Sequence, residues 1–330
     1  MPIGPALGGP RRLMPKPSAG PDERARLRAL ADDSEARSAY ALSLLEATRD
    51  RESLLAALRV LAETPRLEAR PVLASRYEEA DANGVRRDPG AYVRVGVVHA
   101  LRPIVLPDDL PLLERAALTY EVLPTSPEDV TGPLRAAALV TIAQIDDTLT
   151  GFHAVRLLGD RRAARMSGEP AATAARVLAA QGRALPLYAY LTREVDLVPE
   201  VVGECLHALV DLPAALLGEV LGRFTTDPVG IVQVGAFDLL LEHPAGESHR
   251  DLLRRFLRET EALDVYRYVV AAVVAARRPA LLDEVMDVAA LERDPSKRLL
   301  LADALSLVRG SARAADLVAR LRNERPGRWP

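Results

Sequence analysis

The sequence predicts an all-α protein in which about nine helix pairs stack into an α-α superhelix. Hydrophobic residues make up 49% of the chain but aromatic residues only 4%, which favours Leu, Val and Ala packed between close helices over a β-sheet core. One apolar helical pattern recurs along the chain. The length of 330 residues exceeds the size at which a single compact core keeps growing, which also favours an elongated array.

The recurring pattern is clearest over residues 88–104. Asp88 is followed by apolar positions at helical spacing, and similar offsets follow Asp196 and Asp227. At about 100° per residue these positions share one arc of a helix, so we expect them to be buried. In the reference helix they are Val93, Val97, Ala100, Leu101 and Ile104.

The rest of the chain reads as a tail followed by alternating helices and breaks. Residues 1–21 alternate Pro and Gly and predict a flexible N-terminal tail. A single repeat domain is then expected over 22–330. The predicted pairs are 22–30 with 34–48, 52–62 with 67–80, 108–121 with 133–145, 147–158 with 171–180, 185–193 with 199–212, 214–224 with 229–242, 248–260 with 264–276 and 279–291 with 295–308. Residues 88–104 form a second helix on their own, and 312–323 form a terminal helix.

The nine units are marked by the residue that follows the first core position of each second helix. These markers are Arg37, Arg70, Arg94, Arg135, Arg176, Val202, Gln233, Arg267 and Arg298. The spacing resembles the second helix of HEAT repeats, and the resemblance covers nearly everything after the tail. It implies a solenoid whose second helices line a concave surface, and it implies structural roles for Asp88, Arg94, Arg135 and Arg176 through hydrogen bonds between units. All but two of the 43 basic residues are arginine, a bias typical of GC-rich bacterial genomes.

Offsets +2, +6 and +9 from the first core residue point away from the predicted core. The residues there are mostly apolar, which is typical of a surface that accepts a helix or peptide of a partner. Tight curvature that buries them between helices is the alternative. We call the following residues the second-helix strip: Val95, His99, Arg102, Val140, Gln181, His207, Val234, Asp238, Leu241 and Tyr268.

Two long breaks, near 123–133 and 159–170, separate the first and second helices of adjacent pairs. In a solenoid such loops project from the same edge, so we expect them to form a raised lip with polar selectivity. The residues of this loop lip are Thr125, Ser126, Glu128, Asp129, Arg161, Arg162 and Arg165.

No standard catalytic or nucleotide-binding motif occurs in the sequence. The single cysteine, Cys205, falls at a core offset and excludes an internal disulfide and a multi-cysteine zinc site. Acid pairs such as Asp146-Asp147 sit at predicted helix starts, where carboxylates cap free N–H groups. We therefore expect no catalytic residue, no cofactor and no bound metal.

These observations favour a protein- or peptide-binding scaffold without catalysis of its own. The alternative is a nucleic-acid-binding protein like the DNA glycosylases found among HEAT-like arrays. The net charge of −3 and the absence of an arginine run on the strip argue against nucleic acid. With no apolar run long enough for a membrane span and no hydrophobic signal core, we expect a cytoplasmic protein without membrane contact, and a monomer.

Overall fold

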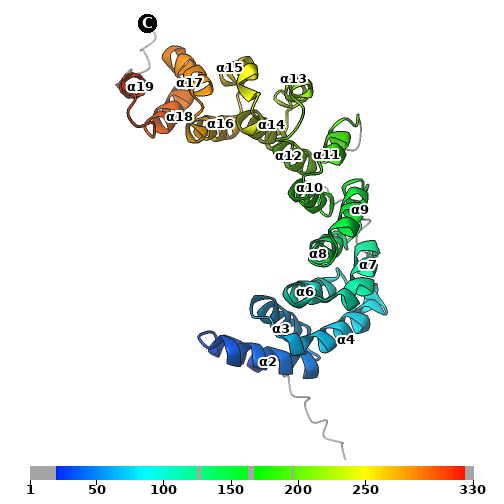
Figure 1. The fold of residues 1–330 in the computed structure, drawn as a ribbon. Helices are drawn as coiled ribbons and strands as arrows, with labels where there is room; N and C mark the ends of the chain where they lie inside the picture. Colours follow the sequence, from blue (N-terminus) through cyan, green and yellow to red (C-terminus); the bar gives the residue numbers. More distant parts are fainter. Residues whose placement is uncertain (1–19, 125–127, 163–166, 195–196, 324–330) are drawn as a thin grey trace, which may run out of the picture. The chain divides into compact units, whose positions relative to one another are not determined.

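The structure, a computed structural model, describes residues 20–124, 128–162, 167–194 and 197–323. Within these ranges the elements are helices, apart from an isolated bridge between Val122 and Asp129. This confirms the all-α class. Most of the predicted tail lies outside the described residues, and the first helix begins at Gly20. The chain divides into two compact units, residues 1–105 and 106–330 (Figure 1).

The first unit contains short helices joined by tight turns. They are α1 (Gly20–Ala29), α2 (Ser34–Ala47), α3 (Arg51–Glu63), η1 (Leu67–Ala69), α4 (Arg70–Asp81), α5 (Gly84–Arg87), α6 (Tyr92–Leu101) and η2 (Arg102–Ile104). Helix starts follow local chemistry: the side chains of Asp33 and Asp50 accept hydrogen bonds from the amides of Ala36 and Ser53. Pro71 lies in the first turn of α4, where its missing N–H group needs no intrahelical partner.

The contacts of the first unit show that the first two helix pairs were predicted wrongly: the helices are correct, but they pair with other neighbours. Helix α3 packs against α2 and against α6, while α4 packs against α6 and α2. The hairpins are therefore α2 with α3 and α4 with α6. Helices α1, α3 and α6 make one row, so Arg37 and Arg70 lie in first helices rather than second helices.

The second unit continues the alternation, and its bounds agree with the predicted pairs to within a few residues. Its helices are η3 (Pro107–Asp109), α7 (Leu110–Leu118), α8 (Gly132–Ile142), α9 (Asp147–Leu158), α10 (Ala171–Ala180), α11 (Ala184–Leu191), α12 (Pro199–His207), α13 (Ala214–Phe224), α14 (Gly230–Glu242), η4 (Gly246–His249), α15 (Arg250–Glu259), α16 (Leu263–Ala276), α17 (Pro279–Leu291), α18 (Pro295–Leu305) and α19 (Ala312–Asn323).

Contacts in the second unit run between neighbouring second helices. Helices α8, α10, α12, α14, α16 and α18 touch in that order. All but α18 also pack against a first helix beside them, and α18 packs against the terminal helix α19. Figure 1 shows this row within the second unit, from green to orange. The predicted core offsets are buried in both units: Val97, Ala100, Val201, Cys205 and Leu240 have no exposed surface.

Basic side chains cap the C-terminal ends of helices in the preceding pair by donating hydrogen bonds to their last carbonyl oxygens. Arg76 on α4 donates to the carbonyl oxygens of Leu45, Glu46 and Thr48. The same arrangement recurs in the second unit with Arg156, Arg223 and Lys297, which donate to the last carbonyls of α7, α11 and α15. A cation at this end offsets the negative end of the helix dipole and pairs carbonyls that lack an intrahelical partner.

Candidate functional site

The structure places the second-helix strip residues on successive helices with different exposure. His99, Arg102, His207 and Tyr268 are exposed, while Val95, Val140, Gln181, Val234 and Asp238 are half-buried. Leu241 is 7% exposed and is therefore not available on this surface. Val95, His99 and Arg102 belong to the first unit, and the other members belong to the second unit.

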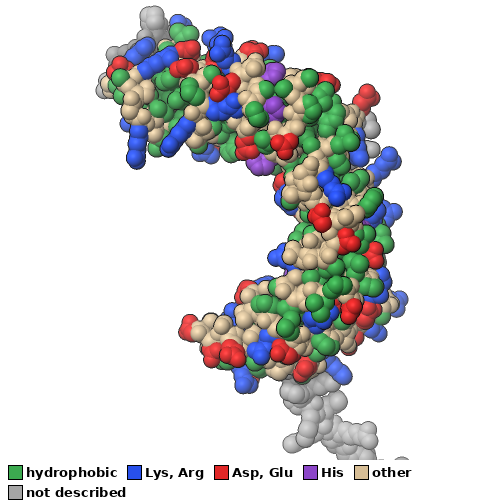
Figure 2. Space-filling view, viewed as in Figure 1, with side chains coloured by type: hydrophobic (Ala, Val, Ile, Leu, Met, Phe, Trp, Pro, Cys, Tyr) green, Lys and Arg blue, Asp and Glu red, His purple; other side chains and the backbone are tan. Residues whose placement is uncertain are grey.

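Three strip residues line one cavity of about 320 Å³ between α12 and α14, which we call the α12–α14 groove. His207 comes from α12, and Val234 and Asp238 come from α14. The remaining lining residues are Glu200, Gly203 and Glu204 on α12 and Ile231 and Gly235 on α14. On each helix the four lining residues follow the spacing i, i+3, i+4, i+7, which is one face of an α-helix. In Figure 2, acidic side chains and a histidine lie next to one another over this part of the second unit.

Two glycines form the floor of the groove. A Cβ atom on Gly235 would lie 2.8 Å from the carbonyl oxygen of Gly203, and one on Gly203 would lie 3.2 Å from the carbonyl oxygen of Ile231. The backbones of α12 and α14 therefore meet without side chains between them. The floor is made of backbone, and the longer side chains stand at its edges.

Polar contacts cross from α12 to α14 and on to α16. His207 Nδ1 lies 3.6 Å from Asp238 Oδ2, and the Tyr268 hydroxyl donates to Asp238 Oδ1 at 2.8 Å. Partial burial, together with the hydrogen bond and the charge of Asp238, raises the pKa of Tyr268 to about 12. The phenol is therefore protonated at neutral pH and acts as a donor. Tyr268 remains 43% exposed, so its ring is part of the accessible surface.

The other edge of the groove is acidic. Glu204 Oε1 accepts a hydrogen bond of 2.6 Å from Arg176 on α10, and Arg176 also reaches Glu169 and Thr173. Glu200 Oε2 is shielded from solvent and has no hydrogen-bond partner among the described residues. Glu200, which lines the groove, therefore has one carboxylate oxygen whose hydrogen-bonding capacity the described residues leave unfilled.

Sequence reasoning missed Glu204 and Gly235, which stand at offset +3, and also missed two further lining residues. These two are Glu200 and Ile231, which share another offset. Each stands one position before the first core residue of its helix, Val201 or Val232. At about 100° per residue, offset −1 lies only about 20° from offset +6, which was assigned to the outward face. Extending the outward set by this position would have identified both residues. Ile231 is 45% exposed, so it belongs to the accessible surface.

The loop lip is divided between exposed and buried members. Glu128, Arg161 and Arg162 are exposed, whereas Thr125, Ser126 and Arg165 lie outside the described residues. The Asp129 side chain is fully buried and lies 2.6 Å from Arg135 Nη2. Asp129 is therefore committed to the interior of the fold and is not free to select a partner.

Asp129 belongs to a buried ionic cluster around Arg135. Arg135 also lies 3.2 Å from Asp160, donates to Thr131 Oγ1 and the Thr119 carbonyl, and packs under the ring of Tyr120 at 4.0 Å. Arg94 in the first unit has a similar environment: it donates to Asp88 and Asp81 and has no exposed surface. These contacts give Asp88, Arg94 and Arg135 structural roles, but the hydrogen bonds of Arg94 run within its own helix pair and not between units as expected.

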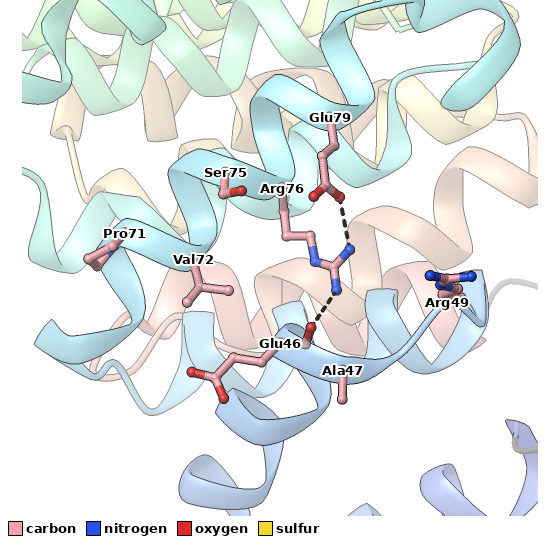
Figure 3. A pocket seen from close by; sticks show the side chains of 8 residues that line it. All are labelled: Glu46, Ala47, Arg49, Pro71, Val72, Ser75, Arg76 and Glu79. Carbon is pink, nitrogen blue, oxygen red and sulfur yellow. Dashed lines mark hydrogen bonds and ion pairs between the residues drawn. The ribbon is translucent and has the colours of Figure 1, made fainter.

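A larger depression of about 700 Å³ lies in the first unit beside α2 and α4. Figure 3 shows that Arg76 points from α4 toward the end of α2, between Glu46 and Glu79. Its guanidinium already donates to three carbonyl oxygens and to Glu79. The charge of the half-buried Arg76 therefore serves helix capping, and none of the described residues that line this cavity has an unpaired buried oxygen like that of Glu200.

A reactive cysteine, a metal site and a membrane-spanning helix find no support in the part of the chain that the structure describes. Cys205 is fully buried, and burial raises the pKa of its thiol, which keeps it protonated. No group of three or more His, Cys, Asp or Glu in the described residues could hold a metal ion. Of the helices described, none combines the length and the apolar character needed to cross a bilayer.

No family model matches the chain, and no curated protein and no solved structure matches it either.

Proposed function

We propose that this chain is a protein- or peptide-binding scaffold that uses the α12–α14 groove and the adjoining surface of α16. The observation that carries the proposal is the groove itself: a hollow on the row of second helices, with a backbone floor, apolar Ile231 and Val234 and a partly exposed Tyr268 beside it. Apolar and aromatic groups next to a few polar groups are what a partner helix or extended peptide contacts.

In this proposal the helices form a HEAT-like α-α solenoid. The support is the succession of contacts between second helices in the second unit and the recurrence of one core pattern in them. In such an array each helix pair buries its apolar face only against its neighbours. One row of helices then remains available for a partner, and the proposal includes no catalytic step.

The nucleic-acid alternative is not favoured by the charges of the groove. Of its eight lining residues, Glu200, Glu204 and Asp238 are acidic and none is Lys or Arg. A phosphate backbone would be repelled there, because nucleic-acid affinity comes mainly from contacts of basic side chains with phosphates.

The test is an affinity capture from native lysate with the wild-type chain and with an Ile231→Gln/Tyr268→Gln double variant. Glutamine keeps the helix and adds no charge, so the change removes apolar contact together with the hydrogen bond from the Tyr268 hydroxyl to Asp238. We expect a partner whose affinity falls about tenfold or more in the double variant. Leu185→Gln on α11, where Leu185 is 78% exposed, is the matched control and should retain the partner.

Two outcomes would contradict the proposal. A protein retained equally by wild type and double variant would bind elsewhere. Nucleic acid retained at low salt and released at high salt would favour the nucleic-acid alternative over the scaffold.

A further inference from the structure

We infer that the α12–α14 groove takes a cationic side chain, an arginine, from the segment that it binds. This inference rests on the proposed function and adds the chemistry of the partner. It follows from three features of the groove: its charge, its one unpaired buried oxygen and its shape.

The charge of the lining is negative on balance. Three carboxylates and one histidine line the groove, and Arg176, which contacts the groove residue Glu204, is also engaged by Glu169. Asp238 receives the Tyr268 hydroxyl, which is a neutral donor. The groove therefore carries carboxylate charge that no cation of the described residues neutralises fully, and a cationic partner is the complementary one.

Among the lining carboxylates, Glu200 has a buried oxygen without a hydrogen-bond partner among the described residues. Its Oε2 atom is shielded from water and accepts no hydrogen bond within the described part of the chain. A shielded carboxylate oxygen without a donor is costly, because that atom has lost water without gaining a hydrogen bond. If the Glu200 side chain turns into the groove, a donor supplied by the partner would remove that cost, and a charged N–H donor forms the stronger bond.

The shape favours arginine over lysine. The glycine floor leaves space for a flat group, and Ile231 and Val234 provide an apolar wall for a long aliphatic stem. The guanidinium presents several donors in one plane, so one group can address more than one carboxylate oxygen, whereas an ammonium acts as a point charge. The exposed ring of Tyr268, whose hydroxyl contacts Asp238, adds a surface on which a guanidinium can stack.

The experiment uses four oriented peptide pools, each a nonapeptide with randomised flanks and Arg, Lys, Gln or Glu fixed at the centre. Each pool is passed over the immobilised full chain and the retained peptide is quantified. We expect the wild type to retain the Arg pool about fivefold more than the Gln pool, with the Lys pool between them and the Glu pool lowest. In Glu200→Gln the Arg preference should fall to less than about twofold.

The matched control is Glu219→Gln, which removes the same charge from an exposed position on first helix α13. It should keep the full Arg preference, so that a loss in Glu200→Gln reports the groove and not the net charge. Circular dichroism of both variants should match that of the wild type.

The results separate this inference from the proposed function. Equal retention of the Arg and Gln pools by the wild type, or an undiminished Arg preference in Glu200→Gln, would overturn the inference alone, provided that the Ile231→Gln/Tyr268→Gln variant loses binding. If the wild type retains no pool better than that double variant does, the proposed function and the inference are both overturned.

Discussion

Helices α8 and α12 belong to the same row of the second unit but differ at the same repeat position, which is a charged residue on α8 and an apolar residue on α12. On α8 the position is Arg135, which is buried with Asp129 and Asp160 against it. On α12 it is Val202, which is 2% exposed, and α12 meets α14 through Gly203 and Gly235 instead. Near α8 an ionic cluster ties loop segments to the helix, whereas at α12 backbone contact leaves a groove on the surface.

This difference indicates which part of the row is built for stability and which is accessible to a partner. The groups around Arg135 satisfy one another inside the protein. Around the α12–α14 groove the ion pairs lie at the surface, as with Arg176 at 50% exposure, and one carboxylate oxygen of Glu200 has no described partner. Changes near α8 should therefore act on folding, and changes at the groove should act on binding.

The largest effect should follow Arg135→Met. Methionine keeps much of the volume but leaves Asp129 and Asp160 near one another without their cation, and removing one partner of a buried ion pair costs about 3–5 kcal/mol. The matched change is Arg176→Met, whose ion pairs are solvent-exposed and should contribute at most about 1 kcal/mol. Urea denaturation followed by circular dichroism measures both, and similar losses in the two variants would refute the contrast.

The contact between α12 and α14 should be less costly to disturb. In Gly235→Ala the new methyl group would overlap the backbone of Gly203, and overpacking of this kind costs about 1–3 kcal/mol. Gly222→Ala is the control, because nothing lies within 4 Å of its Cβ position in α13. There the gain in helix propensity should stabilise the protein by up to about 1 kcal/mol. Destabilisation by both substitutions would show that the glycine contact is not special.

The sequence predicted the helices and their buried faces because both depend on local spacing. Val97, Ala100 and Cys205 were predicted as core and are buried. The assignment of Arg37 and Arg70 to second helices was wrong because the dipeptide Ala-Arg also occurs in a second helix, at Ala175-Arg176 in α10. The dipeptide alone therefore does not distinguish first helices from second helices. Packing distinguished them, since α3 rather than α4 shares a row with α1 and α6.

The groove was predicted only in part, and the helix-capping cations were not predicted. His207, Val234 and Asp238 followed from the outward offsets, whereas the close approach at Gly203 and Gly235 depends on how two helices meet. Arg223 donates to a carbonyl 32 residues earlier in the chain. Such a contact has no local pattern, because it depends on the stacking of one helix pair on the next.

The smallest expected effect is the pH dependence of the stabilisation by Asp129, and it again separates the buried cluster from the surface. Burial alone would raise the pKa of Asp129, but hydrogen bonds from Arg135, Thr131 and the amide of Glu121, with the charge of Arg135, outweigh it and lower the pKa below its ordinary value of 3.8. A carboxylate with a lowered pKa in the folded state stabilises the protein above its unfolded pKa. That stabilisation is lost as the pH falls through the folded value.

Asp129→Asn should therefore be less stable than the wild type at pH 6, and the difference between their urea midpoints should narrow as the pH falls from about 5 to about 3. The control is Asp316→Asn on α19, an exposed position whose urea midpoint should follow that of the wild type across the range. A constant difference between Asp129→Asn and the wild type would mean that the charge of Asp129 does not stabilise the fold. The cluster around Arg135 would then depend on Asp160 and on packing against Tyr120, and the contrast with the α12–α14 groove would be one of shape rather than of charge.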